Sequence, residues 1–345
     1  MNPNAIGPGE EIVPPGEAEA IARELAINLK LLDTKARPVL RGEHPKSNGT
    51  VRAEFEVKED VPDAVKYGVF RRPAKFSAVV RFSNGRTADD NQGDIHGMAI
   101  KLFGVIGEHV LETDRTATTQ DFILADDPVF FIKDVDEYLN FSSRVFQARR
   151  TFLGKIAFII KLLFYQTSPW PSLKRAISKK PDSPLRIAYW SQTPYRLGDR
   201  AVKYHARPDL TLTPAPEPSR SPNKLRIATA ERLAVGEAIF DFMIQLQSDP
   251  VADPIEDPTR LWDETRAPFV KVATLRIPRQ IFDVEAMNAF GERLSFNPWH
   301  TLVEHRPLGG INRARKAVYE AMSHKRRELD GFPLVEPAVA DIPTV

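Results

Sequence analysis

Proline restricts the fold of this chain more than any other residue type. It accounts for 29 of the 345 residues, about 8%, whereas globular proteins average about 5%. Because proline lacks a backbone donor and clashes with the preceding helical turn, it interrupts helices. The prolines are densest between residues 166 and 222, in the runs SPWPSLKRA, KPDSPL and TPAPEPSRSPN. This pattern argues against a bundle of long helices and favours strands, turns and a wrapping loop region at 166–222.

Strand-like alternation marks the part of the chain after Pro38. The segment TVRAEFEVKED alternates apolar and charged residues with the period of two that is typical of a half-buried strand. KFSAVVRFSNG and GMAIKLFGV predict two further strands, each closed by a turn that contains glycine, and VKVATLRIP predicts another. The proline inside DFILADDPVFFIKD indicates a bent strand or a loop there.

Helical composition appears at both ends and in the middle of the chain. The predicted helices cover residues 17–32, 137–165, the first part of 232–247, which then turns into a strand, and 311–329. The last of these is the most clearly amphipathic.

The segment TFLGKIAFIIKLLFY at 151–165 is strongly apolar. It is shorter than the roughly 20 residues that a bilayer-spanning helix needs, and Lys155 and Lys161 interrupt it. Two interpretations remain open. The helix is either covered by the protein or a partner, or it lies in the interface of a membrane or lipid assembly.

Charge and composition exclude several classes of protein. The 48 basic and 46 acidic residues leave a net charge of +2, so no overall field attracts the chain to nucleic acid. The absence of cysteine excludes disulfides, thiolate metal sites and cysteine nucleophiles. The sequence has no P-loop, dinucleotide fingerprint or G-x-S-x-G elbow. The start MNPNAIGPGEE lacks the basic and apolar parts of a signal peptide, so we expect a cytoplasmic protein.

Histidine supplies the candidates for acid–base chemistry. None of the seven histidines belongs to the H-E-x-x-H pattern of a metalloprotease helix. His44 stands in RGEHPKSNGTVRAEF, three residues after Arg41 and just before a predicted strand. From spacing alone it is a turn histidine as readily as a catalytic one. His300 and His305 lie five residues apart in NPWHTLVEHRPLGG, where structural hydrogen bonding is a simpler interpretation than metal binding.

Four blocks, taken together, carry a family resemblance: RGEHPKSNGTVRAEF, VRFSNG, DIHGMAIKLF and DFILADDPVFFIKD. Their order and spacing resemble the haem catalase superfamily. The similarity is closest to its short, single-domain branch of catalase-related peroxidases and proteins that metabolise fatty-acid hydroperoxides. It extends over residues 37–145 and more loosely over 186–320. The resemblance implies haem b as cofactor and hydrogen peroxide, or an organic or lipid hydroperoxide, as substrate.

The resemblance assigns roles on the distal side, where a peroxide would bind. His44 matches the histidine that moves a proton between the two peroxide oxygens, and Ser83 the residue that orients its ring. Ala125 stands where catalases carry a distal asparagine, and Asp126 is the polar group that follows it. A carboxylate donates a hydrogen bond only when it is protonated, so Asp126 replaces the amide only in part.

Further residues match the haem pocket. Arg41 and Arg81 match arginines that pair with the haem propionates. Gly97 matches the place where the backbone passes close to the porphyrin, and Phe130 and Tyr138 match aromatic residues of the distal pocket. Without the resemblance, Arg81 is a charge on a strand surface and Phe130 a core residue.

On the proximal side, the family holds its iron by a tyrosinate in an R-x-x-x-Y-x-D-T-x-x-x-R helix. Aligned on Arg293, this chain has Asn297 at the tyrosine position and Glu304 at that of the second arginine. Arg293 is then the candidate haem anchor and Asn297 the residue at the ligand position, while His300 or a shifted register offers a substitute ligand. The surrounding segment is equally explained as a structural turn.

The sequence therefore predicts an α+β fold, with a closed antiparallel β-barrel of the catalase type, a wrapping loop and external helices. We expect no C-terminal flavodoxin-like domain. The expected parts are a flexible arm at 1–16, one domain at 17–330 and a tail at 331–345. Within the domain we expect the barrel at 37–145 and 200–280, the helical and wrapping segment at 146–222 and the last helix at 311–329.

The function expected from this resemblance is O–O bond cleavage with haem and a distal histidine. The alternative is a haem-poor or haem-free protein of the same fold that binds a ligand or partner. We expect no nucleic-acid partner, a peripheral membrane contact through 151–165, and association into a homo-oligomer.

Overall fold

The computed structural model describes residues 7, 9–35, 37–164 and 169–344. Its centre is an antiparallel sheet of nine strands: β1 (Lys46–Val57), β2 (Ala74–Asn84), β3 (His96–Phe103), β4 (Thr119–Ala125), β5 (Tyr189–Trp190), β6 (Tyr195–Leu197), β7 (Arg200–Pro208), β8 (Ala238–Leu246) and β9 (Val270–Ile277). Strand β5 pairs with both β4 and β7, so eight strands close a barrel, and β6 extends it as a hairpin with β7. The prediction of an α+β fold with a closed antiparallel barrel is confirmed.

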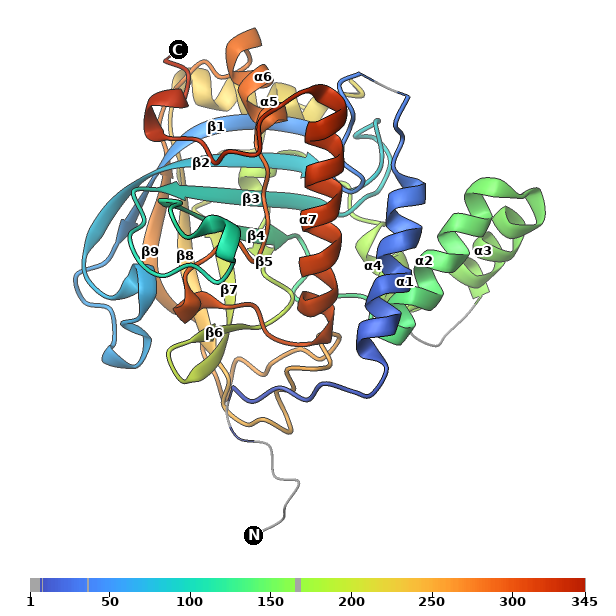
Figure 1. Ribbon diagram of the computed structural model, residues 1–345. Coiled ribbons are helices and arrows are strands. Elements are labelled where there is room, and N and C mark those ends of the chain that lie inside the picture. The colour runs from blue at the N-terminus through green and yellow to red at the C-terminus, as the bar shows by residue number, and fades with distance from the viewer. Residues whose placement is uncertain (1–6, 8, 36, 165–168, 345) are drawn as a thin grey trace.

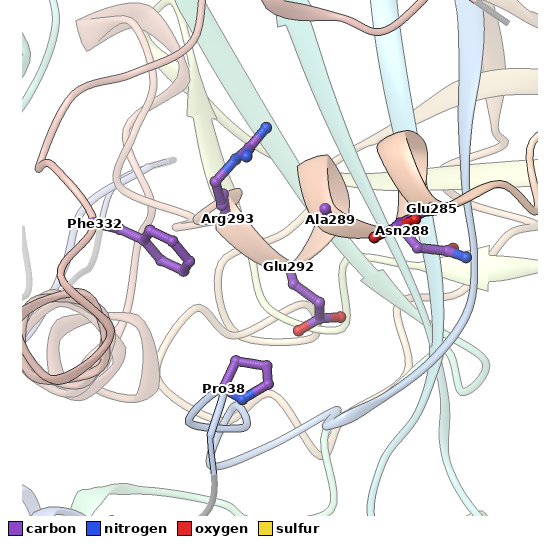
Figure 2. A pocket seen from close by; sticks show the side chains of 7 residues that line it. All are labelled: Pro38, Glu285, Asn288, Ala289, Glu292, Arg293 and Phe332. Atoms are coloured by element: carbon purple, nitrogen blue, oxygen red, sulfur yellow. The ribbon is translucent and has the colours of Figure 1, made fainter.

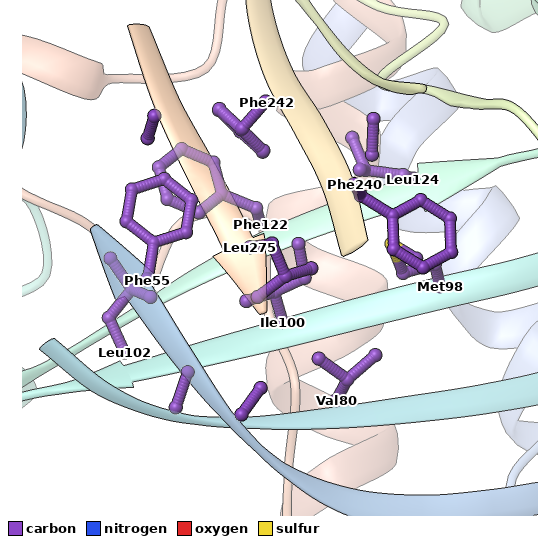
Figure 3. Close-up of a cluster of buried hydrophobic side chains, with 14 of the residues drawn as sticks. Phe55, Val80, Met98, Ile100, Leu102, Phe122, Leu124, Phe240, Phe242 and Leu275 are labelled. Carbon is purple, nitrogen blue, oxygen red and sulfur yellow. The ribbon is translucent and has the colours of Figure 1, made fainter. Parts of the chain in front are cut away.

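Alternating side chains fill the barrel. Strand β1 shows the predicted period of two, because Ala53, Phe55 and Val57 are buried while the glutamates between them are exposed. Figure 3 shows how residues of different strands meet inside the barrel. The ring centroids of Phe55 and Phe122 lie 5.0 Å and 4.9 Å, respectively, from that of Phe242. This apolar interior leaves functional groups to the ends and the outer face of the barrel.

Seven helices lie outside the barrel within the described residues: α1 (Glu17–Leu31), α2 (Val135–Arg150), α3 (Phe152–Phe164), α4 (Trp170–Ala176), α5 (Lys224–Val235), α6 (Glu285–Arg293) and α7 (Gly310–Asp330). Helix α7 crosses beside the ends of β1, β2 and β3, with α1 and α2 packed next to it (Figure 1). None of the helices in the described part of the chain is long and apolar enough to cross a membrane.

The element boundaries differ from the prediction in two places. The helix expected at 137–165 is two helices, because Thr151 adopts an extended conformation between α2 and α3; Tyr165 lies outside the described residues. The second half of the barrel begins at Tyr189, inside the stretch that we expected to wrap as loops, and not at residue 200. Short strands in a proline-rich segment carry little periodicity, so the sequence pattern does not reveal them.

The two ends of the chain contact the body of the protein. In the segment predicted as a flexible arm, Glu11 pairs with Arg306 and Arg313, and Gly9 donates a backbone hydrogen bond to Gln247. In the tail, Glu336 pairs with a buried lysine of β3. Residues 1–6, 8 and 345 of these two segments lie outside the described residues.

Candidate functional site

His44 lies against the outer face of the barrel at the end of β2 and β3. Its backbone adopts a left-handed conformation, with φ of 55°, and its N–H donates to the carbonyl of Gly85 over 3.0 Å. The ring Nδ1 is 3.1 Å from the hydroxyl oxygen of Ser83. A Cβ at Gly97 would lie 2.8 Å from two ring atoms of His44, so only glycine leaves the ring its space. The structure thus brings together three of the predicted site residues.

The strand register sets this arrangement. Ser83 pairs with Gly97, and Gly97 pairs with Ala125, so the three residues form one row across the outer face of β2, β3 and β4. Because side chains alternate along a strand, Asp126 continues the inward row of β4. Ala125 therefore occupies the position beside His44, where the resemblance implied an asparagine.

Asp126 is held by other partners. Its Oδ2 is 2.8 Å from Nδ1 of His96, and its backbone N–H donates to the carbonyl of His96. The ammonium group of Lys179 donates to its backbone carbonyl and lies 3.7 Å from Oδ1. The charge of Asp126 also raises the pKa of His44, and its buried Oδ1 has no hydrogen-bond partner among the described residues. The catalytic role of Asp126 stays a prediction.

The environment of His44 keeps its ring neutral. Burial, together with the nearby guanidinium of Arg81, lowers the pKa of His44 to about 4. A neutral imidazole has one nitrogen that accepts a proton and one that donates it. At neutral pH the ring can therefore act as a base, with Ser83 fixing the role of Nδ1.

Buried arginines gather beside this pair. Arg41 donates to the carbonyls of Gly291 and Leu294, both over 2.8 Å, and to Glu292 over 3.0 Å. Arg81 is 3% exposed and lies 3.8 Å from Glu292. Its Nε is buried and has no hydrogen-bond partner among the described residues.

A third arginine joins them from α7. Arg326 donates to the backbone carbonyls of Glu292 and Leu294. Burial, together with the charge of Arg41, lowers the pKa of Arg326 to about 10. Burial and the charge of Arg41 also lower the pKa of Arg81 well below its usual range. Cationic groups that lower each other's pKa form an electrostatic environment that favours an anion.

Helix α7 faces the loop that carries His44. A Cβ at Gly42 would lie 2.7 Å from the terminal methyl of Met322, so the loop and α7 are in close contact. One turn before Met322, the phenol oxygen of Tyr319 lies 3.3 Å from Nη2 of Arg315. Neighbouring tyrosines raise the pKa of Arg315, whose buried guanidinium stays charged.

The predicted aromatic residues lie next to α7. The rings of Phe130 and Tyr138 meet edge to face, with centroids 6.4 Å apart. Burial raises the pKa of Tyr138 strongly, and the charge of Glu43 adds to this effect. Tyr319 and Arg315 of α7 also influence the pKa of Tyr138, which therefore lies close to both α7 and the loop of His44.

Arg293 has a different environment. It lines an open cavity of about 700 Å³ between α6 and the end of α7, which Figure 2 shows with Glu292, Pro38 and Phe332 on its walls. His44 does not line this cavity. Glu292 connects this cavity with the arginine cluster beside His44, because it lines the cavity and its carboxylate accepts from Arg41.

Asn297 and His300 are bonded near the other end of β4. The backbone N–H of Asn297 donates to Asp121, and its side-chain oxygen accepts from the N–H of Trp299. His300 uses both ring nitrogens, with Thr119 at 2.6 Å and Asp114 at 2.5 Å. Thr119 is six residues from Ala125, which corresponds to about 20 Å along a strand. The structure does not bring either residue to His44, and their role as metal ligands stays a prediction.

The sequence interpretation missed Arg315 and Tyr319, and it gave Arg326 no role. A signal for them exists, because Arg315, Tyr319 and Arg326 repeat the spacing of the first arginine, the tyrosine and the second arginine in the proximal pattern of the catalase superfamily. The alignment on Arg293 concealed it, although a shifted register remained open as an alternative.

Comparisons with known proteins agree with this architecture. No family model and no curated protein matches the sequence. Solved structures do match: a bacterial catalase (TM-score 0.60, 16% identity), a fungal catalase (0.58, 17%) and catalase A from Saccharomyces cerevisiae (0.58, 16%). Each match covers 97% of this chain, and 67%, 66% and 68% of the respective catalase. The chain therefore has a catalase-like fold and spans about two thirds of the length of these catalases.

Proposed function

We propose that this protein is a haem enzyme that cleaves the O–O bond of hydroperoxides. The observation that carries the proposal is the oriented pair of His44 and Ser83, which lies across from a helix bearing Arg315 and Tyr319. We further propose Tyr319, and not Asn297 or His300, as the axial ligand, because it stands at the tyrosine position of the proximal pattern.

The residues fit a haem group. A phenol oxygen that receives a hydrogen bond from a charged guanidinium can carry the negative charge of a ligand, and Arg315 supplies this donor to Tyr319. The cluster of Arg41, Arg81 and Arg326 has Glu292 as the shared carboxylate, and the unpartnered Nε of Arg81 is available to a propionate. Gly97 leaves the space above the outer face of β3 that the ring of His44 occupies.

Haem, when bound, supplies the iron at which the O–O bond is broken. His44 takes the proton of the incoming hydroperoxide and returns it to the oxygen that leaves as water or alcohol. Its pKa of about 4 keeps the ring ready to accept that proton above pH 5. Ser83 holds Nδ1, which leaves Nε2 as the nitrogen that exchanges the proton.

The distal side favours an organic hydroperoxide over hydrogen peroxide. Ala125 offers a methyl group where an amide would donate a hydrogen bond, and Asp126 is bound to His96. A methyl group at this position suits the carbon chain of an alkyl or lipid hydroperoxide better than a second small polar molecule.

One observation favours the alternative of a haem-poor or haem-free binding protein. Arg41 and Arg326 already donate to carbonyls at the end of α6, and Arg81 donates to the carbonyl of Pro45, so each of the three arginines has a protein partner and Arg81 keeps its Nε unpartnered among the described residues. An anionic ligand other than haem would then meet mainly Arg81.

The visible spectrum of protein purified from haem-supplemented cells tests the proposal. We expect a Soret band near one haem per chain, its loss in Tyr319→Phe and its retention in the control Asn297→Ala. His44→Gln should keep the band but lose turnover of cumene hydroperoxide by about 100-fold or more. A colourless but folded wild-type protein would exclude the enzyme and favour the haem-free alternative.

A further inference from the structure

Helix α3 exposes an apolar face that none of the described residues covers. It projects from the body of the protein beyond α2 (Figure 1). Its exposed apolar residues are Phe152, Leu153, Ile156, Ile159, Ile160 and Phe164, of which Phe152 and Leu153 are each 77% exposed. Large apolar side chains that gather on one face of a helix mark an interaction surface.

The two faces of α3 are clearly separated. On the inner face, Phe158 packs edge to face on Trp170, with ring centroids 5.3 Å apart, and Leu162 joins the same cluster. With about 100° between successive helical residues, the six exposed residues fall within an arc of about 140° on the opposite side. Lys155 and Lys161 fall on either border of this arc. Lysines at the borders of an apolar face are typical of helices that lie in a membrane interface.

The charged side chains in the sequence around α3 are all basic. Residues 138–181 contain nine lysines and arginines and no aspartate or glutamate. Between the ends of α1 and α2, Lys30, Arg149 and Arg150 line a cavity of about 350 Å³ together with Leu31 and Phe146. This basic surface is complementary to the phosphate groups of anionic lipids and repels a second copy of itself.

We propose that α3 docks the protein onto the surface of an anionic membrane. The outer face of α3 enters the boundary between head groups and acyl chains, while the basic residues of α2 and α3 contact the phosphates. With 13 residues, α3 lies in the interface and does not span the bilayer. This surface is separate from His44 and Tyr319, so the proposal stands whether or not haem binds.

Vesicle co-sedimentation of the full chain tests this proposal. The probes are vesicles of phosphatidylcholine alone and of phosphatidylcholine with phosphatidylglycerol. We expect binding to the anionic vesicles that weakens with added salt, and little binding to the neutral ones. The variant Phe152→Ser/Ile160→Ser should bind the anionic vesicles at least about tenfold more weakly than the wild type. The control Ile106→Ser/Val251→Ser changes side chains that are 88% and 84% exposed elsewhere, and it should bind like the wild type.

Three results would overturn the proposal. The first is a wild-type protein that stays in solution with anionic vesicles. The second is unchanged binding by Phe152→Ser/Ile160→Ser, with an unchanged circular dichroism spectrum as evidence that the variant is folded. The third is a concentration-dependent dimer, without vesicle binding, that the same variant abolishes; this would assign the face to a second copy of the chain.

Discussion

Acidification should destabilise this protein in part through the buried His305. A variant can isolate the contribution of this residue to the pH dependence of the unfolding free energy. His305 is fully buried inside one end of the barrel. Its Nε2 accepts the backbone N–H of Val69 over 3.0 Å, so Nδ1 carries the proton and donates to the hydroxyl of Tyr204 over 2.8 Å. Burial lowers the pKa of His305 to about 3. Protonation of Nε2 would break the bond from Val69.

The magnitude follows from the difference between folded and unfolded states. An unfolded histidine takes up a proton near pH 6.5, whereas the folded protein keeps His305 neutral down to about pH 3. The stability that depends on neutral His305 is therefore fully present above pH 6.5 and is lost as the pH falls from 6.5 toward 3. A shift of one pKa unit corresponds to about 1.4 kcal/mol, so the loss between pH 6.5 and 4.5 is about 3 kcal/mol.

Urea unfolding of the wild type and of His305→Gln, at steps from about pH 7 to about pH 4.5, measures this effect. Glutamine can accept from Val69 and donate to Tyr204 but does not titrate. We expect the variant to be less stable at pH 7 and the difference in unfolding free energy to shrink by about 3 kcal/mol at pH 4.5. His44 and His205, whose pKa values burial lowers to about 4, contribute equally to both proteins. Exposed His324→Gln is the control, and parallel curves for wild type and His305→Gln would refute the reasoning.

Two further predictions concern the outer face of the barrel. Gly97→Ala places a methyl group 2.8 Å from the ring of His44, which must move by about 1 Å and lose its bond to Ser83; we expect hydroperoxide turnover to fall about 100-fold with an unchanged Soret band. Unchanged turnover would contradict the role of the His44 ring. Lys101→Met leaves Asp121 and Glu336, now 2.7 Å and 2.6 Å from the buried ammonium, without their cation. We expect a loss of about 3–5 kcal/mol in urea unfolding, whereas a loss below about 1 kcal/mol would contradict the importance of this ion pair.

The barrel was predictable because its signal is local. Each long strand carries its own alternation of apolar and polar residues, as in the stretch from Val51 to Val57, and glycine turns mark the strand ends. The strand β5 has two residues and no periodicity, so its place in the barrel depends on partners in β4 and β7 that are distant in sequence. The break at Thr151 likewise leaves no mark, because both flanking segments favour a helix.

The distal side of the site was likewise easier to predict than the proximal side, because its residues lie in short local blocks. His44, Ser83 and Gly97 stand in short blocks whose spacing is preserved, so their proximity could be expected. The role that we propose for Tyr319 depends on which face of α7 meets the His44 loop. That face is defined by the contact between Gly42 and Met322, which are 280 positions apart in the sequence. The hydrogen bond of Asp126 to His96 could not be expected either, because His96 lies on the neighbouring strand.

The closure of the barrel through β5 has a consequence for motion. Only Ala125–Trp190 on one side, and Tyr189–Ala206 with Trp190–His205 on the other, join the two halves of the sheet at this seam. A seam with so few backbone bonds opens at a lower free energy than the long ladders of β1 with β2. Ala125 belongs both to the seam and to the row that carries Ser83 and Gly97. Local opening of the seam would therefore widen the wall beside His44 while the rest of the barrel stays folded.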